Sequence, residues 1–292
     1  MSDRLRVLPQ YLLPKQVLTQ LTGRLASLRG GALTTAAVRA FVRRYGVDMA
    51  EAAQPDPAAY ASFNEFFTRP LRAGARPLAA SGLVCPVDGA ISQCGAIDGD
   101  RIVQAKGHHY TTTALLGGDR ALAAHFHGGS FATLYLSPRD YHRIHMPCAG
   151  RLLRMVHVPG ELFSVNPLTA RAVPGLFARN ERVVCVFEGE GGPDGVRGPW
   201  ALVLVGATIV GSMATVWHGL VNPPRPGVVR QWDYTDREVR LGRGDEMGRF
   251  LLGSTVVLLY GPRAGGDLPP VFEPGWAPGA PVRLGQAMAR VS

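Results

Sequence analysis

Hydrophobic residues recur with helical spacing in two stretches near the N-terminus. Pro14 is well placed to start the first helix, and Gly30 and Gly31 are well placed to stop it. One face of that helix carries Val17, Leu18, Leu21, Leu25 and Leu28. A second helix is predicted from about residue 34 to a cap at Gly46. Its hydrophobic stripe consists of Ala37, Val38, Phe41, Val42 and Tyr45.

From about residue 84 the pattern changes to short hydrophobic runs separated by Gly, Pro and Asp. Such runs predict β-strands joined by tight turns. The run from Phe250 to Tyr260 predicts one buried strand. Gly253, Ser254 and Thr255 interrupt that run with its least hydrophobic side chains.

The two patterns together predict an α+β fold. Residues 1–62 form an N-terminal region of amphipathic helices, and residues 63–292 form a β-rich domain. The 36 Gly and 23 Pro supply many turns for such a domain. With 46% hydrophobic and 18% charged residues, the chain has the composition of a globular protein that buries a full core.

No transmembrane helix is expected. The longest hydrophobic stretch starts at Ala201, is too short to span a bilayer and is rich in β-branched residues. Pro9 and Pro14 interrupt the segment in which a signal peptide would have its hydrophobic core. The cysteines show no C-x-x-C spacing, which predicts reduced, mostly buried thiols in a cytosolic protein. They are Cys85, Cys94, Cys148 and Cys185.

The net charge of +9 limits the partners but not the fold. Nucleic acid, an anionic membrane surface and acidic substrates all remain open. Residues 1–50 hold eight Lys and Arg against two Asp. Basic amphipathic helices of this kind lie on anionic bilayers, or they pack on their own domain or on a second subunit.

His142 and His145 lie in the stretch DYHRIHMP and fall on opposite faces if this stretch is a strand. The H-x-x-H spacing suggests zinc, but two ligands make only half of a site. A structural role is the default for each histidine alone, and no metal is predicted. The other histidines considered, none at a spacing that completes a site, are His108, His109, His125 and His127.

Asp88, His145 and Ser254 are the side-chain types of a nucleophilic triad, although Asp88 alone is typical of an Asp-Gly turn. The chain has no G-x-S-x-G elbow, which argues against an ordinary serine hydrolase. Ser254 directly follows Gly253 within a hydrophobic run, so its nearest acyl carbon is that of Gly253. A serine held there can attack its own upstream carbonyl, and glycine permits the contorted backbone because it has no Cβ.

The motif LGST at Leu252–Thr255 resembles the processing site of the bacterial, pyruvoyl-dependent phosphatidylserine decarboxylases. Together with its flanks it forms one of eight similar blocks, which follow the order of that family and cover roughly residues 5 to 290. The blocks are FNEFFTRPLR from Phe63, PVDGAISQ from Pro86, QAKGHHYT from Gln104, LSPRDYHRIHMPCAG from Leu136, PGELFSVNP from Pro159, LFARNERVV from Leu176, VGATIVGS from Val205 and EMGRFLLGST from Glu246.

The resemblance implies a self-processing proenzyme. Ser254 would attack the Gly253 carbonyl, and elimination would leave a β chain of residues 1–253 and an α chain of residues 254–292. The cleaved strand would lie in the core of the catalytic domain. Ser254 would become a pyruvoyl group, with His145 as the base of this step and Asp88 orienting it.

The same resemblance implies the chemistry of the mature enzyme. The pyruvoyl carbonyl derived from Ser254 would form a Schiff base with the amine of phosphatidylserine, and loss of carbon dioxide would give phosphatidylethanolamine. His142 matches a second family histidine, expected in substrate handling and proton transfer. No other cofactor is implied.

The implied partners are phosphatidylserine, an anionic membrane surface and a second copy of the chain in a homodimer. The N-terminal helices then become the expected dock on the cytoplasmic face of the cell membrane, and nucleic acid is not expected. Two alternatives remain at this point. One is a serine hydrolase that uses Asp88, His145 and Ser254 in trans, and the other is a basic lipid- or nucleic-acid-binding module without chemistry.

Overall fold

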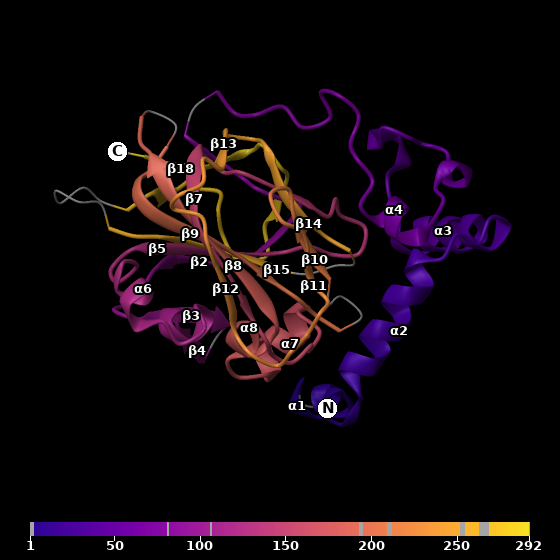
Figure 1. Ribbon diagram of the computed structural model, residues 1–292, viewed down its shortest axis with the longest axis horizontal. Coiled ribbons are helices and arrows are strands. Elements are labelled where there is room, and N and C mark those ends of the chain that lie inside the picture. The colour runs from indigo at the N-terminus through magenta and orange to yellow at the C-terminus, as the bar shows by residue number, and fades with distance from the viewer. Residues whose placement is uncertain are drawn as a thin grey trace.

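The computed structural model describes residues 3–80, 82–105, 107–192, 195–208, 212–251, 255–262 and 269–291 (Figure 1). Its longer helices lie at the N-terminus. The α-helices are α1 (Asp3–Leu12), α2 (Lys15–Ser27), α3 (Ala32–Tyr45), α4 (Phe63–Phe67), α5 (Thr112–Leu115), α6 (Arg120–Ala124), α7 (Pro167–Ala172) and α8 (Leu176–Arg179). Short 3-10 turns cover Met49–Glu51 and Pro57–Ala59.

The strands pair in antiparallel fashion and form two larger and two smaller sheets. They are β1 (Leu83–Val84), β2 (Gly89–Ala96), β3 (Arg101–Ala105), β4 (His108–Thr111), β5 (Ser130–Tyr135), β6 (Arg143–His145), β7 (Gly150–Val158), β8 (Arg182–Glu190), β9 (Arg197–Val205), β10 (Met213–Thr215), β11 (Gly219–Asn222), β12 (Arg230–Asp233), β13 (Arg240–Leu241), β14 (Glu246–Phe250), β15 (Thr255–Tyr260), β16 (Val271–Phe272), β17 (Pro281–Val282) and β18 (Ala287–Arg290). The nine-stranded sheet has the order β12-β7-β8-β9-β15-β5-β2-β17, with β13 also on β7. The four-stranded sheet has the order β11-β10-β14-β6.

The nine-stranded sheet is buried on both faces, as its central strand β15 shows. Val256 and Leu258 belong to one hydrophobic cluster, and Val257 and Leu259 belong to another. The four-stranded sheet closes the first cluster, and helices α5 to α8 close the second. Figure 1 shows α6, α7 and α8 below the large sheet and β10, β11 and β14 beside it. This mixture of helices with antiparallel sheets is the predicted α+β class.

The two predicted N-terminal helices are confirmed as α2 and α3. Gly46 ends α3 in the left-handed conformation, with φ of 67°, and its N–H donates to the Val42 carbonyl. Helix α1 was not predicted, because Pro9 normally breaks a helical pattern. Pro9 lies inside α1, which packs on the domain instead of standing alone.

Helix α1 lies against the β-rich domain near α7. The Asp3 carboxylate accepts a bond of 3.0 Å from Arg171, and the ring of Tyr11 packs edge-on against Phe163 at 4.9 Å. Val7 is buried in the core. Helix α1 therefore packs on its own domain.

Helix α2 leaves most of its predicted hydrophobic face uncovered. The exposed fractions are 63% for Val17, 54% for Leu21, 58% for Leu25 and 59% for Leu28. Among the described residues, no helix is long and apolar enough to cross a membrane.

The prediction of one strand from Phe250 to Tyr260 is wrong. Phe250 ends β14 in the four-stranded sheet, whereas Thr255 begins β15 in the nine-stranded sheet. Both strands are hydrophobic because each contributes to the same core, so the pattern alone does not show that the chain changes sheets. The predicted cleavage site lies in the connection between them.

We predict that replacement of Gly89 by alanine destabilises the fold. A Cβ at Gly89 would lie 2.2 Å from the Tyr135 carbonyl oxygen, so β2 must move away from β5. The expected loss in the free energy of unfolding is about 1–3 kcal/mol, measured by urea denaturation. The matched control is Gly23→Ala in α2, where no atom lies within 4 Å. It should stabilise by about 0.5–1 kcal/mol, and equal effects of the two substitutions would contradict the account.

Candidate active site

A row of paired residues crosses five strands of the large sheet at one end. Ala90 pairs with Tyr135, which pairs with Thr255, and Thr255 also pairs with Val205. Val205 in turn pairs with Arg182 of β8. Thr255 is therefore held on both sides at the point where β15 begins.

The predicted cleavage residues Gly253 and Ser254 lie outside the described residues. Both flanks of this segment are described. The Leu251 N–H donates to the Ser212 carbonyl at 3.0 Å. Thr255 is fully buried, and its Oγ1 has no hydrogen-bond partner among the described residues. The site is therefore built up from what surrounds these two ends.

Asp88 lies at a bend directly before β2, close to the paired row. The bend is not a hairpin, because β1 and β2 belong to different sheets. Arg76 donates to both carboxylate oxygens of Asp88, at 2.9 Å from Nε and 2.6 Å from Nη2, and the Leu284 N–H donates at 2.9 Å. Arg76 Nη2 also donates to Glu51 at 2.6 Å. The hydrogen bond with Asp88, more than that with Glu51, raises the pKa of Arg76.

His145 is fixed in one tautomer by its neighbours. Its Nδ1–H donates to the Gly244 carbonyl at 2.7 Å, which leaves the lone pair on Nε2. The Tyr141 hydroxyl lies 3.1 Å from Nε2, and the backbone N–H of His145 donates to Pro86 at 2.9 Å. Burial lowers the pKa of His145, against the opposing effects of the Gly244 carbonyl and the Glu246 carboxylate. The ring is thus a neutral base with Nε2 as its basic atom.

His142 is fully buried and is also neutral. Its Nδ1–H donates to the Asp140 carbonyl at 2.8 Å, and its ring packs on Phe67 with centroids 4.1 Å apart. Burial lowers its pKa to about 3, and the nearby charge of Arg69 lowers it further. The Nε2 atom has no partner among the described residues. Because the Phe250 N–H donates to the His142 carbonyl, this histidine lies beside the strand that leads into the cleavage segment.

The structure brings Asp88, His142 and His145 to the end of the sheet at which β15 begins. It does not join Asp88 to His145 by a hydrogen bond within the described residues. The Asp88 carboxylate is held by Arg76, and the Nδ1 of His145 is held by Gly244. Sequence reasoning missed Arg76, since nothing in its local pattern marks it as the partner of Asp88.

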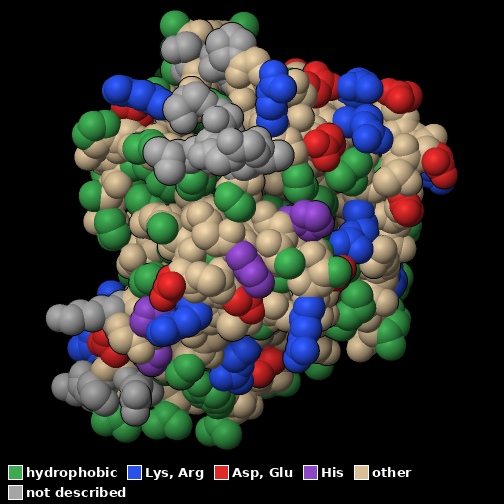
Figure 2. Space-filling view, turned by 90° about the vertical axis from the view of Figure 1, so that its left-hand side faces the viewer, with side chains coloured by type: hydrophobic (Ala, Val, Ile, Leu, Met, Phe, Trp, Pro, Cys, Tyr) green, Lys and Arg blue, Asp and Glu red, His purple; other side chains and the backbone are tan. Residues whose placement is uncertain are grey.

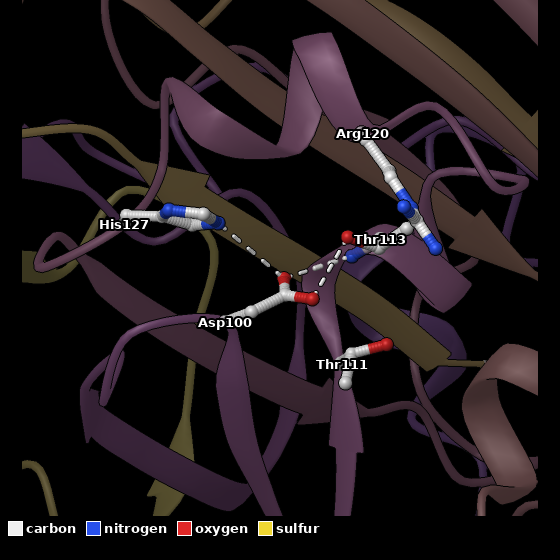
Figure 3. Close-up of a pocket in the computed structure, with 5 residues that line it drawn as sticks. All are labelled: Asp100, Thr111, Thr113, Arg120 and His127. Carbon is white, nitrogen blue, oxygen red and sulfur yellow. Dashed lines mark hydrogen bonds and ion pairs between the residues drawn. The ribbon is translucent and has the colours of Figure 1, made fainter.

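A separate pocket of about 450 Å³ lies at the other end of β2 (Figure 3). It is lined by Asp100, Thr111, Thr113, Arg120 and His127. Asp100 accepts bonds from the backbone and the hydroxyl of Thr113, at 3.0 and 2.8 Å, and His127 lies 3.8 Å from it. Since Asp88 precedes β2 and Asp100 follows it, this pocket is not part of the candidate active site.

A metal centre is not apparent in the described parts of the chain. No group of three or more His, Cys, Asp or Glu side chains there is arranged to hold an ion. The Nδ1 atoms of His142 and His145 are bound to different carbonyl groups, those of Asp140 and Gly244.

Comparison with known proteins gives matches along nearly the whole chain. A family model described as phosphatidylserine decarboxylase matches residues 63–290, and a second model, described as PSD, matches residues 5–46. The phosphatidylserine decarboxylase proenzyme of Azoarcus sp. (strain BH72) is 71% identical over 99% of this chain and 96% of its own length. Those of Acidovorax ebreus (strain TPSY) and Verminephrobacter eiseniae (strain EF01-2) are each 70% identical over 99% of this chain. The matches cover 98% and 99% of these two relatives.

The burial of neutral His142 predicts a pH-dependent stability. Its folded pKa of about 3 lies below the unfolded value of about 6.5, so the unfolded chain binds the extra proton between these values. The free energy of unfolding should therefore fall as the pH drops below about 6.5. His142→Gln should reduce this slope by up to about 1.4 kcal/mol per pH unit.

Urea unfolding between pH 6 and pH 4 measures this slope. The matched control is His109→Gln, at an exposed position of β4, which should keep the wild-type slope. If His142→Gln also kept the wild-type slope, the account of a buried neutral ring would be wrong.

Proposed function

The chain belongs to the phosphatidylserine decarboxylase family, and we propose that it makes its own catalytic group by breaking between Gly253 and Ser254. The enzyme is a carboxy-lyase that converts phosphatidylserine to phosphatidylethanolamine and carbon dioxide. One observation carries the proposal for the site. Asp88, His142 and His145 converge on the end of the sheet where β15 begins, directly after Ser254.

The proposed self-processing consumes one water molecule and releases one nitrogen of the chain as ammonia. The Ser254 Oγ attacks the Gly253 carbonyl carbon, and the amide bond breaks to give an ester. Loss of the Cα proton of residue 254 then breaks its Cβ–Oγ bond, and Gly253 leaves as a carboxylate. Hydrolysis of the remaining dehydroalanine gives the pyruvoyl group and releases ammonia.

His145 is the proposed base of the first step, since its Nε2 lone pair accepts the Ser254 hydroxyl proton. Its Nδ1–H is held by the Gly244 carbonyl, which fixes the tautomer that this role needs. For Asp88 to orient His145, that N–H has to exchange the Gly244 carbonyl for the Asp88 carboxylate. The proximity of Asp88 supports this exchange, because the backbone N–H of His145 donates to the carbonyl of Pro86, two residues before Asp88.

The surroundings fit a reactive carbonyl at the start of β15. Two buried polar atoms there, Thr255 Oγ1 and His142 Nε2, have no partner among the described residues. A pyruvoyl group at this position supplies a carbonyl for the substrate amine and an electron sink for decarboxylation. We propose that His142 Nε2 takes a proton from the substrate ammonium. The same atom then returns a proton to the substrate carbon that has lost carbon dioxide.

Docking on an anionic membrane is the proposed role of the N-terminal helices. Helix α2 presents Val17, Leu21, Leu25 and Leu28 to the outside, in a region that is rich in basic residues. On the face turned away from these helices, Figure 2 shows acidic, basic and hydrophobic side chains interspersed. We place the enzyme at the cytoplasmic face of the membrane, and the homodimer stays a prediction from the family resemblance.

The two histidines should separate processing from decarboxylation. His145→Gln removes the proposed base for Ser254, so cleavage of the chain should slow by about 10²–10⁴-fold. His142→Gln should leave cleavage near the wild-type rate but lower kcat for phosphatidylserine by about 10²–10⁴-fold. Denaturing gels and product assays measure the two rates, with His109→Gln as control. If His142→Gln slowed cleavage and His145→Gln slowed only decarboxylation, the two histidines would have each other's roles. If neither variant lowered either rate, both proposed roles would be wrong.

The membrane dock is tested with vesicles. Leu21→Ser combined with Leu25→Ser should weaken binding to vesicles of phosphatidylglycerol and phosphatidylcholine at least about tenfold, because two leucines no longer enter the bilayer. Co-sedimentation measures the bound fraction. The control is Val103→Ser with Val271→Ser, which are also exposed but lie on β3 and β16. Equal binding by both double variants would contradict the proposed docking face.

A further inference from the structure

Arg69 is a buried cation without an acidic partner. Only 4% of the residue is exposed, and its guanidinium lies over the ring of Phe66 at 5.2 Å. Within the described residues the side chain makes one hydrogen bond, from Nη2 to the Arg139 carbonyl at a long 3.4 Å, and its Nε has no partner. Among the described residues it forms no ion pair. Burial of such a group is costly unless an anion joins it.

The nearest carboxylates do not supply that anion. Asp88 and Glu51 are close enough to act on the charge of Arg69, but both are bound to Arg76 at 2.6 Å. Since Arg76 already donates to both carboxylates, Arg69 keeps donors for a ligand. The planar guanidinium of an arginine is suited to bidentate binding of an oxyanion.

Arg69 lies on the path between the proposed membrane dock and His142. Helix α4 directly precedes it, and Asn64 of α4 donates to Ser27 of α2 at 2.8 Å. At the other end of α4, Phe67 packs on the His142 ring. The carbonyl that Arg69 contacts belongs to Arg139, in the loop that leads to His142. Arg69 is therefore linked through α4 to the proposed dock, and through Phe67 and the Arg139 loop to His142.

We propose that Arg69 binds the phosphodiester oxyanion of the lipid substrate, an inference that rests on the proposed function. The substrate carboxylate is the other possible oxyanion. It must leave as neutral carbon dioxide, so a cation on it would stabilise the ground state more than the transition state. The phosphodiester keeps its charge throughout the reaction, and binding there holds the head group without opposing the chemistry.

The position also couples binding to proton transfer. The charge of Arg69 contributes to the low pKa of His142. A phosphodiester at Arg69 would offset this charge, so substrate binding would make the Nε2 of His142 a better proton acceptor. Removal of the Arg69 charge should therefore move the acidic limb of kcat/KM, which reports the free enzyme, to higher pH.

The kinetic test uses the full-length, self-processed enzyme and dihexanoyl phosphatidylserine. Arg69→Gln should process at the wild-type rate and raise KM by about 10- to 100-fold, since a charge-assisted bond is lost. Arg69→Lys should restore part of the affinity because it keeps the charge. The matched control is Arg72→Gln, an exposed position three residues further along, which should leave KM unchanged.

A binding test works without the catalytic group. The full-length Ser254→Ala chain is titrated calorimetrically with dihexanoyl phosphatidylethanolamine, which has the phosphodiester but no carboxylate, and with dihexanoyl phosphatidylserine. Adding Arg69→Gln should weaken both ligands by the same factor. If only phosphatidylserine were weakened, Arg69 would bind the carboxylate and the proposal would be overturned.

Two further outcomes also overturn the proposal. Unchanged binding and an unchanged KM in Arg69→Gln would show that Arg69 has no ligand role. Failure of both Arg69→Gln and Arg69→Lys to process, together with a lower Tm, would show a structural role. Failure of the proposed function is a separate result, because the wild-type chain would then neither cleave nor decarboxylate, whereas the titrations of the Ser254→Ala chain would still report on Arg69.

Discussion

The two-sided hydrogen bonding of β15 is the constraint on which the rest of the site depends. From Thr255 to Tyr260 the strand pairs with β5 on one side and with β9 on the other, and all six of its residues are buried. A chain broken between Gly253 and Ser254 would therefore keep the segment from Thr255 onward paired on both sides. The pairings of β17 with β2 and of β18 with β1 add further attachments for the same segment. Cleavage at this point removes a covalent bond but leaves the core packed.

Desolvation explains the charge states of the histidines near the start of β15. The histidines are neutral because burial disfavours their charged forms, and two carbonyl groups set their tautomers. The two arginines nearby differ in their partners. Arg76 connects Asp88 to Glu51, whereas Arg69 has no acidic partner among the described residues. This difference between neighbouring arginines supports the anionic ligand proposed for Arg69.

Much of this arrangement could be predicted from the sequence. Helical periodicity predicted α2 and α3, and the family resemblance pointed to Asp88, His142 and His145, whose roles stay predictions. The prediction of one strand from Phe250 to Tyr260 was wrong, because a hydrophobic pattern indicates burial and not the sheet to which a strand belongs. Helix α1 was missed because tertiary contacts, such as those of Val7, override the helix-breaking effect of Pro9.

The contacts that long-range folding creates could not be predicted. Arg76 and Asp88 are twelve residues apart, and Leu284, which also binds Asp88, comes from the far end of the chain. The Gly244 carbonyl takes the place next to His145 that the triad assigns to Asp88. No local pattern marks such partners, because they depend on how β6, β14 and the C-terminal strands meet.

The mass of the intact protein under denaturing conditions, measured beside that of Ser254→Ala, tests the central claim most directly. The account predicts two fragments from the wild-type chain, residues 1–253 and 254–292, with a pyruvoyl group at the start of the smaller one. The Ser254→Ala chain should remain whole. A single full-length chain in both samples would contradict self-processing, and with it the catalytic role proposed for the start of β15.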